Sequence, residues 1–250
     1  MALTKITGEG VGTLSSSGAT TATFNRTTSD GAIIDVQKDG TTVGNIGARA
    51  GYLRIGSGDT GLLFVSGTDS IHPENIDGGA DRDGAIDIGV AGARFRNLYL
   101  SGGAYIGGTG SANYLDDYEE GTFTPIWSGA GAPTYSAQVG RYTKIGNRVI
   151  ANLYLIISNK STMSGTQKVS GLPFTSENTS NNYNAASIWF NTMDGASPFN
   201  GNQSREAFQV PNTTNIQIYA GNGSGGLHQL DTSHMTNSTD VMLTVSYNVS

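Results

Sequence analysis

The chain has 250 residues, a net charge of −6 at pH 7, 14% charged residues, 36 glycines and no cysteine. An acidic surface neutralises few phosphates, so nucleic acid is not an expected partner. The lack of cysteine excludes disulfides and thiolate metal sites. No apolar run approaches the roughly 18 residues of a membrane-spanning helix, so we expect no membrane insertion. Low charge with abundant Gly, Ser, Thr and Asn favours β structure over long surface helices.

Residues 1–30 are polar and lack periodicity, and we predict a leader that attaches the chain to a partner. From residue 31 onward, short apolar runs alternate with turn residues at a spacing of about ten, which indicates β structure. We therefore predict a Gly-rich β stem over residues 31–118. Its expected strands are IIDV (33–36), TVGNI (42–46), YLRI (52–55), GLLFV (61–65), AIDI (85–88), RNLYL (96–100) and AYIGG (104–108).

The glycine content of this region bears on its oligomeric state. Residues 1–118 hold 23 of the 36 glycines, which leaves few large side chains for a core. A stem of two or three short strands is marginally stable alone. Identical chains that wind together can share one narrow core, and we predict a homotrimer. The alternative is a monomeric β-solenoid or β-sandwich.

One stretch of the stem is rich in aspartate and contains Asp77, Asp81, Asp83 and Asp87. If Gly84 is set at the sixth position of an EF-hand loop, Gly79 and Val90 fall at positions one and twelve, which need carboxylate ligands. We therefore interpret the aspartates as turn residues. A Ca²⁺ ion bound across chains stays an open alternative, and no other metal or cofactor is expected.

Three motifs follow one another in the middle of the chain: IGVAGARFRNLYLSGGAYIGG (88–108), YEEGTFTP (118–125) and QVGRYTKIGNRV (138–149). In this order they resemble structural proteins of tailed bacteriophages, particularly tail-fibre-like proteins, over residues 83–157. The resemblance implies a trimeric fibre or knob on the virion surface, made in the host cytoplasm. It carries no catalytic residues.

Four acidic residues lie where the stem is expected to meet the head: Asp116, Asp117, Glu119 and Glu120. Glycosidases need two carboxylates facing each other across a substrate, whereas these four are adjacent in sequence. We therefore expect them to pair with arginines of the same or a neighbouring chain and to fix the head on the stem. The predicted inter-chain joint consists of Arg94, Arg96, Asp116, Asp117, Glu119, Glu120 and Arg141.

Longer strands are expected in residues 119–250. The run 149–157 is apolar on both faces, which is typical of a central strand. The run 241–249 alternates cleanly, with five apolar or aromatic positions on one face, and we expect it to lie within a sheet. About eight strands in this region fit a jelly-roll-like β-sandwich head.

Long polar loops connect these strands, and loops on a rigid sandwich are where recognition usually occurs. Sugar recognition favours aromatic faces next to Asn side chains, so we predict a receptor-binding set in or beside these loops. Trp189 and Tyr219 lie on predicted strands, and we expect both in the core. The receptor-binding set consists of Tyr183, Phe199, Asn181, Asn200 and Asn222.

Together these features predict a non-enzymatic phage tail fibre. Its N-terminus would bind other virion proteins, and its head loops would bind a host-surface glycan or protein. The sequence contains no Cys nucleophile, GxSxG elbow or phosphate-binding loop. Two alternatives stay open: a capsid decoration or head-fibre protein, and a polysaccharide-depolymerase tailspike.

Overall fold

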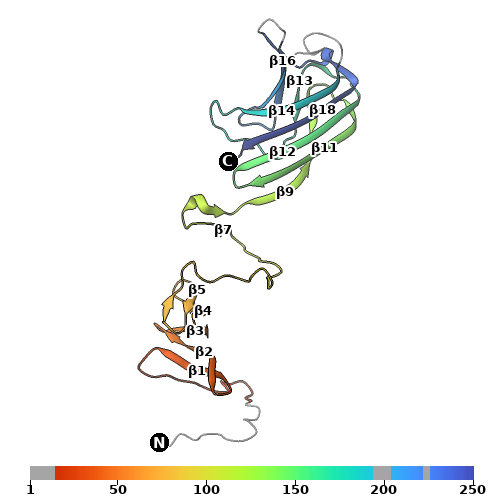
Figure 1. Cartoon of the computed structure of the whole chain (residues 1–250). Helices are drawn as coiled ribbons and strands as arrows, with labels where there is room; N and C mark the ends of the chain where they lie inside the picture. Colours follow the sequence, from red (N-terminus) through yellow and green to blue (C-terminus); the bar gives the residue numbers. More distant parts are fainter. Residues whose placement is uncertain (1–14, 194–203, 222–225) are drawn as a thin grey trace, which may run out of the picture. The chain divides into compact units, whose positions relative to one another are not determined.

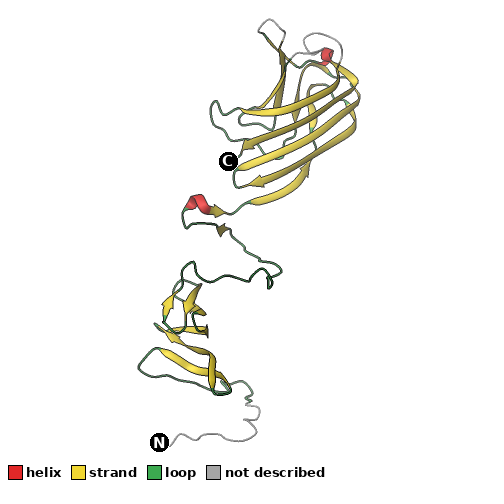
Figure 2. Cartoon of the chain, in the orientation of Figure 1, coloured by secondary structure: helices red, strands yellow, loops and turns green. Residues whose placement is uncertain are grey.

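The computed structural model describes residues 15–193, 204–221 and 226–250. Over these ranges the chain is built from antiparallel β-strands and two short 3₁₀ turns, which confirms the predicted all-β fold (Figure 2). Internal contacts divide the chain into two compact units, residues 1–98 and 99–250. The predicted limits of leader, stem and head, after residues 30 and 118, stay predictions. Within the described residues, no helix is long and apolar enough to cross a membrane.

In the first unit, the described strands form one six-stranded sheet, here called the small sheet, in which each strand pairs with the next (Figure 1). Tight turns allow this order. Asp39-Gly40 and Ala50-Gly51 have positive φ at both positions, as two-residue hairpin turns require. The strands are β1 (Gly31–Lys38), β2 (Thr41–Arg49), β3 (Tyr52–Ser57), β4 (Thr60–Val65), β5 (Ser70–Asn75) and β6 (Ala80–Asp81).

One face of the small sheet carries a compact core. Strict alternation in β4 buries Leu63 and Val65, and Ile76, which follows β5, packs on the same face. Ile76 lies so close to Gly61 that a Cβ at this glycine would come within 2.4 Å of its side chain. Glycine is therefore required here for Ile76 to reach the sheet.

The same buried face holds an ionic cluster. The Glu74 side chain is fully buried, and its Oε1 lies 3.4 Å from Arg49 Nε and 3.4 Å from Arg54 Nη1. Arg54 Nη1 also donates to the Ile76 carbonyl at 2.9 Å. A carboxylate at this depth requires its cationic partners, because an unpaired buried charge is costly.

Two of the predicted stem strands do not form. Residues 85–88 and 96–100 have no strand assignment. Within the described residues neither run is paired with a neighbouring strand, and a strand needs such an edge for its backbone hydrogen bonds. Of the predicted strand 104–108, residues 104–105 form β7 (Ala104–Tyr105), which pairs with β8 (Tyr114–Leu115) around a 3₁₀ turn, η1 (Ser111–Asn113).

In the second unit, ten described strands form one antiparallel sheet, here called the large sheet. Its order is β10-β13-β16-β15-β14-β18-β12-β11-β9, with β17 beside β16. The strands are β9 (Tyr118–Phe123), β10 (Ile126–Ala130), β11 (Thr134–Ile145), β12 (Arg148–Asn159), β13 (Ser164–Ser170), β14 (Asn184–Met193), β15 (Arg205–Gln209), β16 (Ile216–Gly221), β17 (Leu227–Gln229) and β18 (Met235–Asn248). A second 3₁₀ turn, η2 (Thr232–His234), precedes β18.

The large sheet curls on itself (Figure 1). Its two end strands, β9 and β10, are consecutive in the chain and are separated by only Thr124 and Pro125. Across the curl, the buried Trp127 ring on β10 stacks against Phe190 on β14, with centroids 6.4 Å apart. The concave side of one continuous sheet therefore encloses the core, and the predicted jelly-roll pattern itself is not confirmed.

Alternation along the two central strands fills this core. On β12, the odd-numbered positions from Val149 to Ile157 are buried, and β12 lies between β11 and β18 as predicted for a central strand. On β18, the odd-numbered positions from Val241 to Tyr247 are buried as well. Burial raises the pKa of Tyr247 to about 12, and its hydroxyl donates to the Phe174 carbonyl at 3.1 Å.

Candidate functional site

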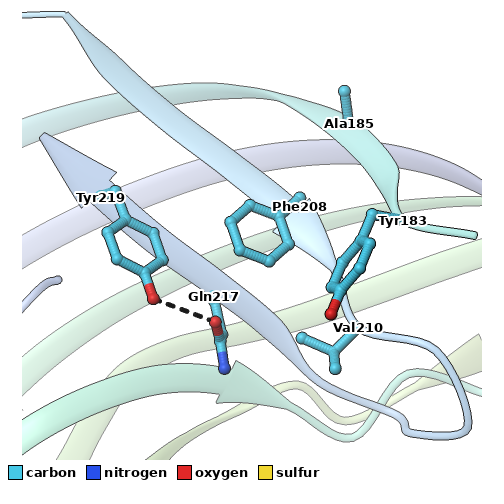
Figure 3. A pocket seen from close by; sticks show the side chains of 6 residues that line it. All are labelled: Tyr183, Ala185, Phe208, Val210, Gln217 and Tyr219. Atoms are coloured by element: carbon cyan, nitrogen blue, oxygen red, sulfur yellow. Dashed lines mark hydrogen bonds between the residues drawn. The ribbon is translucent and has the colours of Figure 1, made fainter. Parts of the chain in front are cut away.

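Three aromatic side chains gather on the outer, convex face of the large sheet (Figure 3). They are Tyr183, which immediately precedes β14, Phe208 on β15 and Tyr219 on β16. We call this group the aromatic platform. Two of them lie on the neighbouring strands β15 and β16, and Tyr183 lies at the start of the next strand, β14, so the sheet holds all three in place.

The alternation of each strand explains why these rings point outward. On β15, Phe208 lies between the buried Ala207 and Gln209. On β16, Tyr219 lies between two buried residues, Ile218 and Ala220. Since successive side chains of a strand point to opposite faces, the intervening rings face solvent.

The rings form a connected surface. Phe208 and Tyr219 stack with centroids 5.6 Å apart and an angle of 11° between their planes. Tyr183 meets the edge of Phe208 at 5.5 Å and 80°. With Ala185, Val210 and Gln217 they line an open depression of about 580 Å³, which is within the usual size range of small-ligand sites.

The chemistry of the platform favours binding over reaction. Its six lining residues include three aromatic rings and one amide but no carboxylate or imidazole. The Tyr219 hydroxyl donates to Gln217 Oε1 at 3.2 Å, which fixes an amide beside the rings (Figure 3). Flat apolar rings beside an amide can hold the apolar face of a sugar and bond its hydroxyls.

The predicted receptor-binding residues have different outcomes. Tyr183 is part of the platform, and Asn181 lies two residues before it in a turn, with φ of 65°. Phe199, Asn200 and Asn222 lie outside the described residues.

The expectation that Trp189 and Tyr219 are core residues is wrong. Trp189 is 46% exposed on β14, and Tyr219 is only partly buried on the outer face. Phe208 was not singled out by sequence reasoning. The signal that could have found it is the alternation around it, since Ala207 and Gln209 occupy the inward positions.

A second apolar row crosses the same outer face. Backbone pairing places Val139, Tyr154, Met242 and Trp189 opposite one another on β11, β12, β18 and β14. The row is flanked by polar residues, and the Tyr154 hydroxyl bonds Asp240 at 3.3 Å. It gives the convex face a second place where a ligand could lie, distinct from the platform.

Three of the four acidic residues of the predicted joint, Asp117, Glu119 and Glu120, have partners within the second unit. Asp117 pairs with Lys144, whose buried ammonium group also lies 5.7 Å from the centre of the Phe174 ring. The Tyr142 hydroxyl donates to Glu119, and this bond raises the pKa of Tyr142 above its usual value. These contacts join Asp117 and Glu119 to β11 within the second unit.

A similar contact engages Glu120. The Tyr118 hydroxyl donates to Glu120, which raises the pKa of Tyr118. Arg141 lies on β11, opposite Thr122 of β9. Pairing of the acids with Arg94 or Arg96 across chains stays a prediction.

The aspartate-rich stretch also engages its own chain. Asp81 pairs with Arg49, and the Asp59 carboxylate accepts from Arg82 at 2.6 Å. Over residues 15–193, 204–221 and 226–250, no group of three or more His, Cys, Asp or Glu side chains is arranged to hold a metal.

Comparisons with known proteins show a distant structural likeness. No protein family and no curated protein matches the chain. Among solved structures, the Dettilon tailspike protein (gp208) is similar at 22% sequence identity with a TM-score of 0.43. The similar region covers 52% of this chain and 24% of the tailspike chain, so this chain matches about a quarter of that protein's length.

Proposed function

We propose that this protein is a non-enzymatic tail appendage of a tailed bacteriophage whose aromatic platform binds a glycan on the host surface. The phage assignment is supported by the motifs at 88–108, 118–125 and 138–149, which resemble tail-fibre-like proteins. In this proposal the N-terminal segment joins other virion proteins.

The observation that carries the glycan assignment is the aromatic platform itself. Large aromatic side chains normally contribute to a core, yet these rings are arranged on the convex side of a sheet whose concave side is already filled. A stacked pair beside a fixed amide is suited to a sugar ring. In a trimer, three copies of a weak site raise apparent affinity by orders of magnitude through avidity.

The proposal is tested by binding of the full chain to an array of bacterial surface polysaccharides. We expect Tyr183→Ala and Phe208→Ala to weaken binding of the recognised polysaccharide by tenfold or more. Tyr105→Ala is the matched control, because Tyr105 is 59% exposed and Tyr183 is 56% exposed, and both lie in the second unit. Binding of this control should equal that of the wild type.

Trp189→Ala distinguishes the platform from the second apolar row. If Trp189→Ala abolishes binding while Tyr183→Ala does not, the ligand lies on the row and the platform assignment is wrong. An array that captures no polysaccharide would contradict the glycan assignment as a whole.

Two further measurements address the rest of the proposal. Release of reducing sugar ends from a bound polysaccharide would overturn the non-enzymatic assignment. Immunogold labelling of phage particles should place the protein on the tail, and labelling confined to the capsid would favour a decoration protein instead.

A further inference from the structure

A polar row crosses the outer, convex face of the large sheet beside the second apolar row. Backbone pairing places its members opposite one another on neighbouring strands, and directly paired residues of antiparallel strands share a face. The members are Thr122 on β9, Arg141 on β11, Asn152 on β12, Thr244 on β18 and Ser187 on β14. Four of them are uncharged, and Arg141 supplies the one positive charge of the row.

The charge of Arg141 is not neutralised by the part of the chain that the structure describes. Among these residues, none forms an ion pair or a hydrogen bond with Arg141. Two acids of β9 that were expected to pair with arginines bond tyrosines instead, Glu119 to Tyr142 and Glu120 to Tyr118. The exposed guanidinium is therefore available to an anionic group of a ligand.

The neighbouring Asn152 adds a second donor. Its Oδ1 accepts from the Thr244 hydroxyl at 2.7 Å, and this bond engages the acceptor end of the amide. Within the described residues the amide nitrogen of Asn152 makes no hydrogen bond, so both of its N–H groups stay available. Arg141 and Asn152 are directly paired, which places their Cβ atoms about 5 Å apart. Together they present chiefly donors, and this arrangement suits a carboxylate.

The surface around this pair is hollowed on both sides. One depression of about 300 Å³ is shared with the second apolar row and has Val139 and Tyr154 in its lining. A second depression of about 390 Å³ lies toward β9 and has Thr122 in its lining. Arg141 and Asn152 line both depressions. Both volumes are at the small end of the range for ligand sites, which fits a single ring.

The linings indicate which ligand fits. In the first depression, exposed Val139 and Met242 can contact the apolar face of a sugar ring, and no lining residue is acidic. In the second depression, the Thr122 hydroxyl can bond sugar hydroxyls. Glu120 lines the second depression and repels a carboxylate placed beside it. The carboxylate of a ligand therefore belongs at Arg141, on the side of the apolar row.

We propose that Arg141 and Asn152 form a site for an acidic sugar, in which both side chains hold the sugar carboxylate and the ring lies against Val139 and Met242. The planar guanidinium can bind a carboxylate through two parallel hydrogen bonds, and such charge-assisted bonds are roughly twice as strong as neutral ones. No residue of this site belongs to the aromatic platform. The site goes beyond the proposed function and stands or falls independently of it.

Ligand-detected saturation-transfer NMR of the full chain tests the ligand class with four small probes. We expect sodium glucuronate to bind about fivefold or more tightly than glucose, which lacks the carboxylate, and than acetate, which lacks the ring. Glucose 6-phosphate should bind more weakly than glucuronate. Equal binding of glucose would overturn the role of the carboxylate, and equal binding of acetate would overturn that of the ring. Equal or tighter binding of glucose 6-phosphate would overturn the choice of carboxylate over phosphate.

Variants test where glucuronate binds. Arg141→Gln should weaken its binding by about fivefold or more, because an amide lacks both the charge and the fork of the guanidinium. Asn152→Asp should weaken binding too, since it places a carboxylate against that of the ligand. Arg148→Gln is the matched control and should bind as the wild type does. Arg148 is exposed on the same face, but its guanidinium already bonds Ser246 and Asn248.

Three results would overturn the site. They are a wild type that binds no glucuronate, an Arg141→Gln variant that binds it with wild-type affinity, and an Arg148→Gln variant that is weakened as much as Arg141→Gln. Both tryptophans lie in the second unit, so their fluorescence verifies that each variant stays folded there. Failure of the proposed polysaccharide binding is a separate result, because Tyr183 and Phe208 line neither depression.

Discussion

The two sheets of this chain place their apolar side chains differently. In the large sheet, β18 alternates so that Val241, Leu243 and Val245 are buried while Met242 faces outward. In the small sheet, β4 also alternates, but both of its faces are apolar, and the ionic cluster around Glu74 lies on the buried side. The large sheet curls to enclose its own core, and the small sheet leaves one apolar face open.

This difference shows what each region needs in order to be stable. A curled sheet of ten described strands buries a large core within one chain. The small sheet buries little more than Leu63, Val65 and Ile76 beside its ion cluster. Small cores rarely supply the stability of a domain unaided. We therefore expect the second unit to be stable alone and the first unit to depend on assembly.

The largest expected effect comes from the ion cluster. Glu74→Ala leaves Arg54 buried without its carboxylate, and breaking a buried pair in this way costs about 3–5 kcal/mol. Amide hydrogen exchange should show loss of protection over β3 to β5, while tryptophan fluorescence of the second unit stays unchanged. Asp35→Ala removes an exposed acid from β1 and should alter stability by less than about 0.5 kcal/mol. If Glu74→Ala and Asp35→Ala changed the stability of the first unit equally, the ion cluster would not be what stabilises the small sheet.

A matched pair of leucine substitutions tests the difference between the two sheets further. Leu155→Ala, in the core of the large sheet, should cost about 2–5 kcal/mol because it leaves a cavity. That loss should not depend on protein concentration. Leu62→Ala should weaken the first unit in a concentration-dependent manner, because it acts on contacts between copies. Chemical denaturation at two protein concentrations, with one probe in each unit, measures both. A concentration-independent effect of Leu62→Ala would argue against coverage by other copies.

The buried tyrosine of the large sheet predicts a pH dependence of stability. Burial raises the pKa of Tyr247 from its ordinary value of 10.0 to about 12, so the folded state favours the neutral phenol. Its stabilising contribution is complete below pH 10 and is lost as the pH rises from 10 through about 12. Tyr247→Phe should cost about 1 kcal/mol at neutral pH and should reduce the alkaline loss of stability. A Tyr247→Phe variant with the same alkaline profile as the wild type would contradict this assignment.

The smallest expected effect lies in a turn of the small sheet. Ala50 has φ of 52°, a conformation in which its Cβ is strained. Ala50→Asn should stabilise the first unit by about 0.5–1 kcal/mol, because Asn tolerates this region better. Gly51→Ala should instead destabilise the first unit. Gly51 has a φ of 82°, which strains a Cβ even though nothing lies within 4 Å of it. Thermal unfolding followed by circular dichroism measures both changes.

Local sequence patterns were sufficient to predict much of the fold. The alternation in 241–249 and the turn residues between 31 and 65 depend on near neighbours only, and strands form at both places. The runs 85–88 and 96–100 also have strand-like composition but form none. A strand requires a second edge, and local composition does not say whether the chain itself supplies one.

The platform could be predicted only in part for a related reason. Tyr183 was identified because it lies in a polar loop, where a large ring is conspicuous. Tyr219 and Trp189 lie on strands, where an aromatic side chain is equally compatible with a core and with an exposed face. Their direction depends on which neighbours are buried, and their proximity depends on a strand order that departs from the order of the sequence.

That strand order also has a consequence for synthesis on the ribosome. β18 lies between β12 and β14 in the sheet, yet it is made after both. The part of the sheet containing β9, β11 and β12 therefore stays unjoined to the part containing β13 to β16 until residues 235–248 have emerged. Ribosome-bound chains that stop before residue 235 should be cleaved by protease throughout the second unit, and longer ones should resist. β18 thus joins the two parts of the large sheet in the nascent protein.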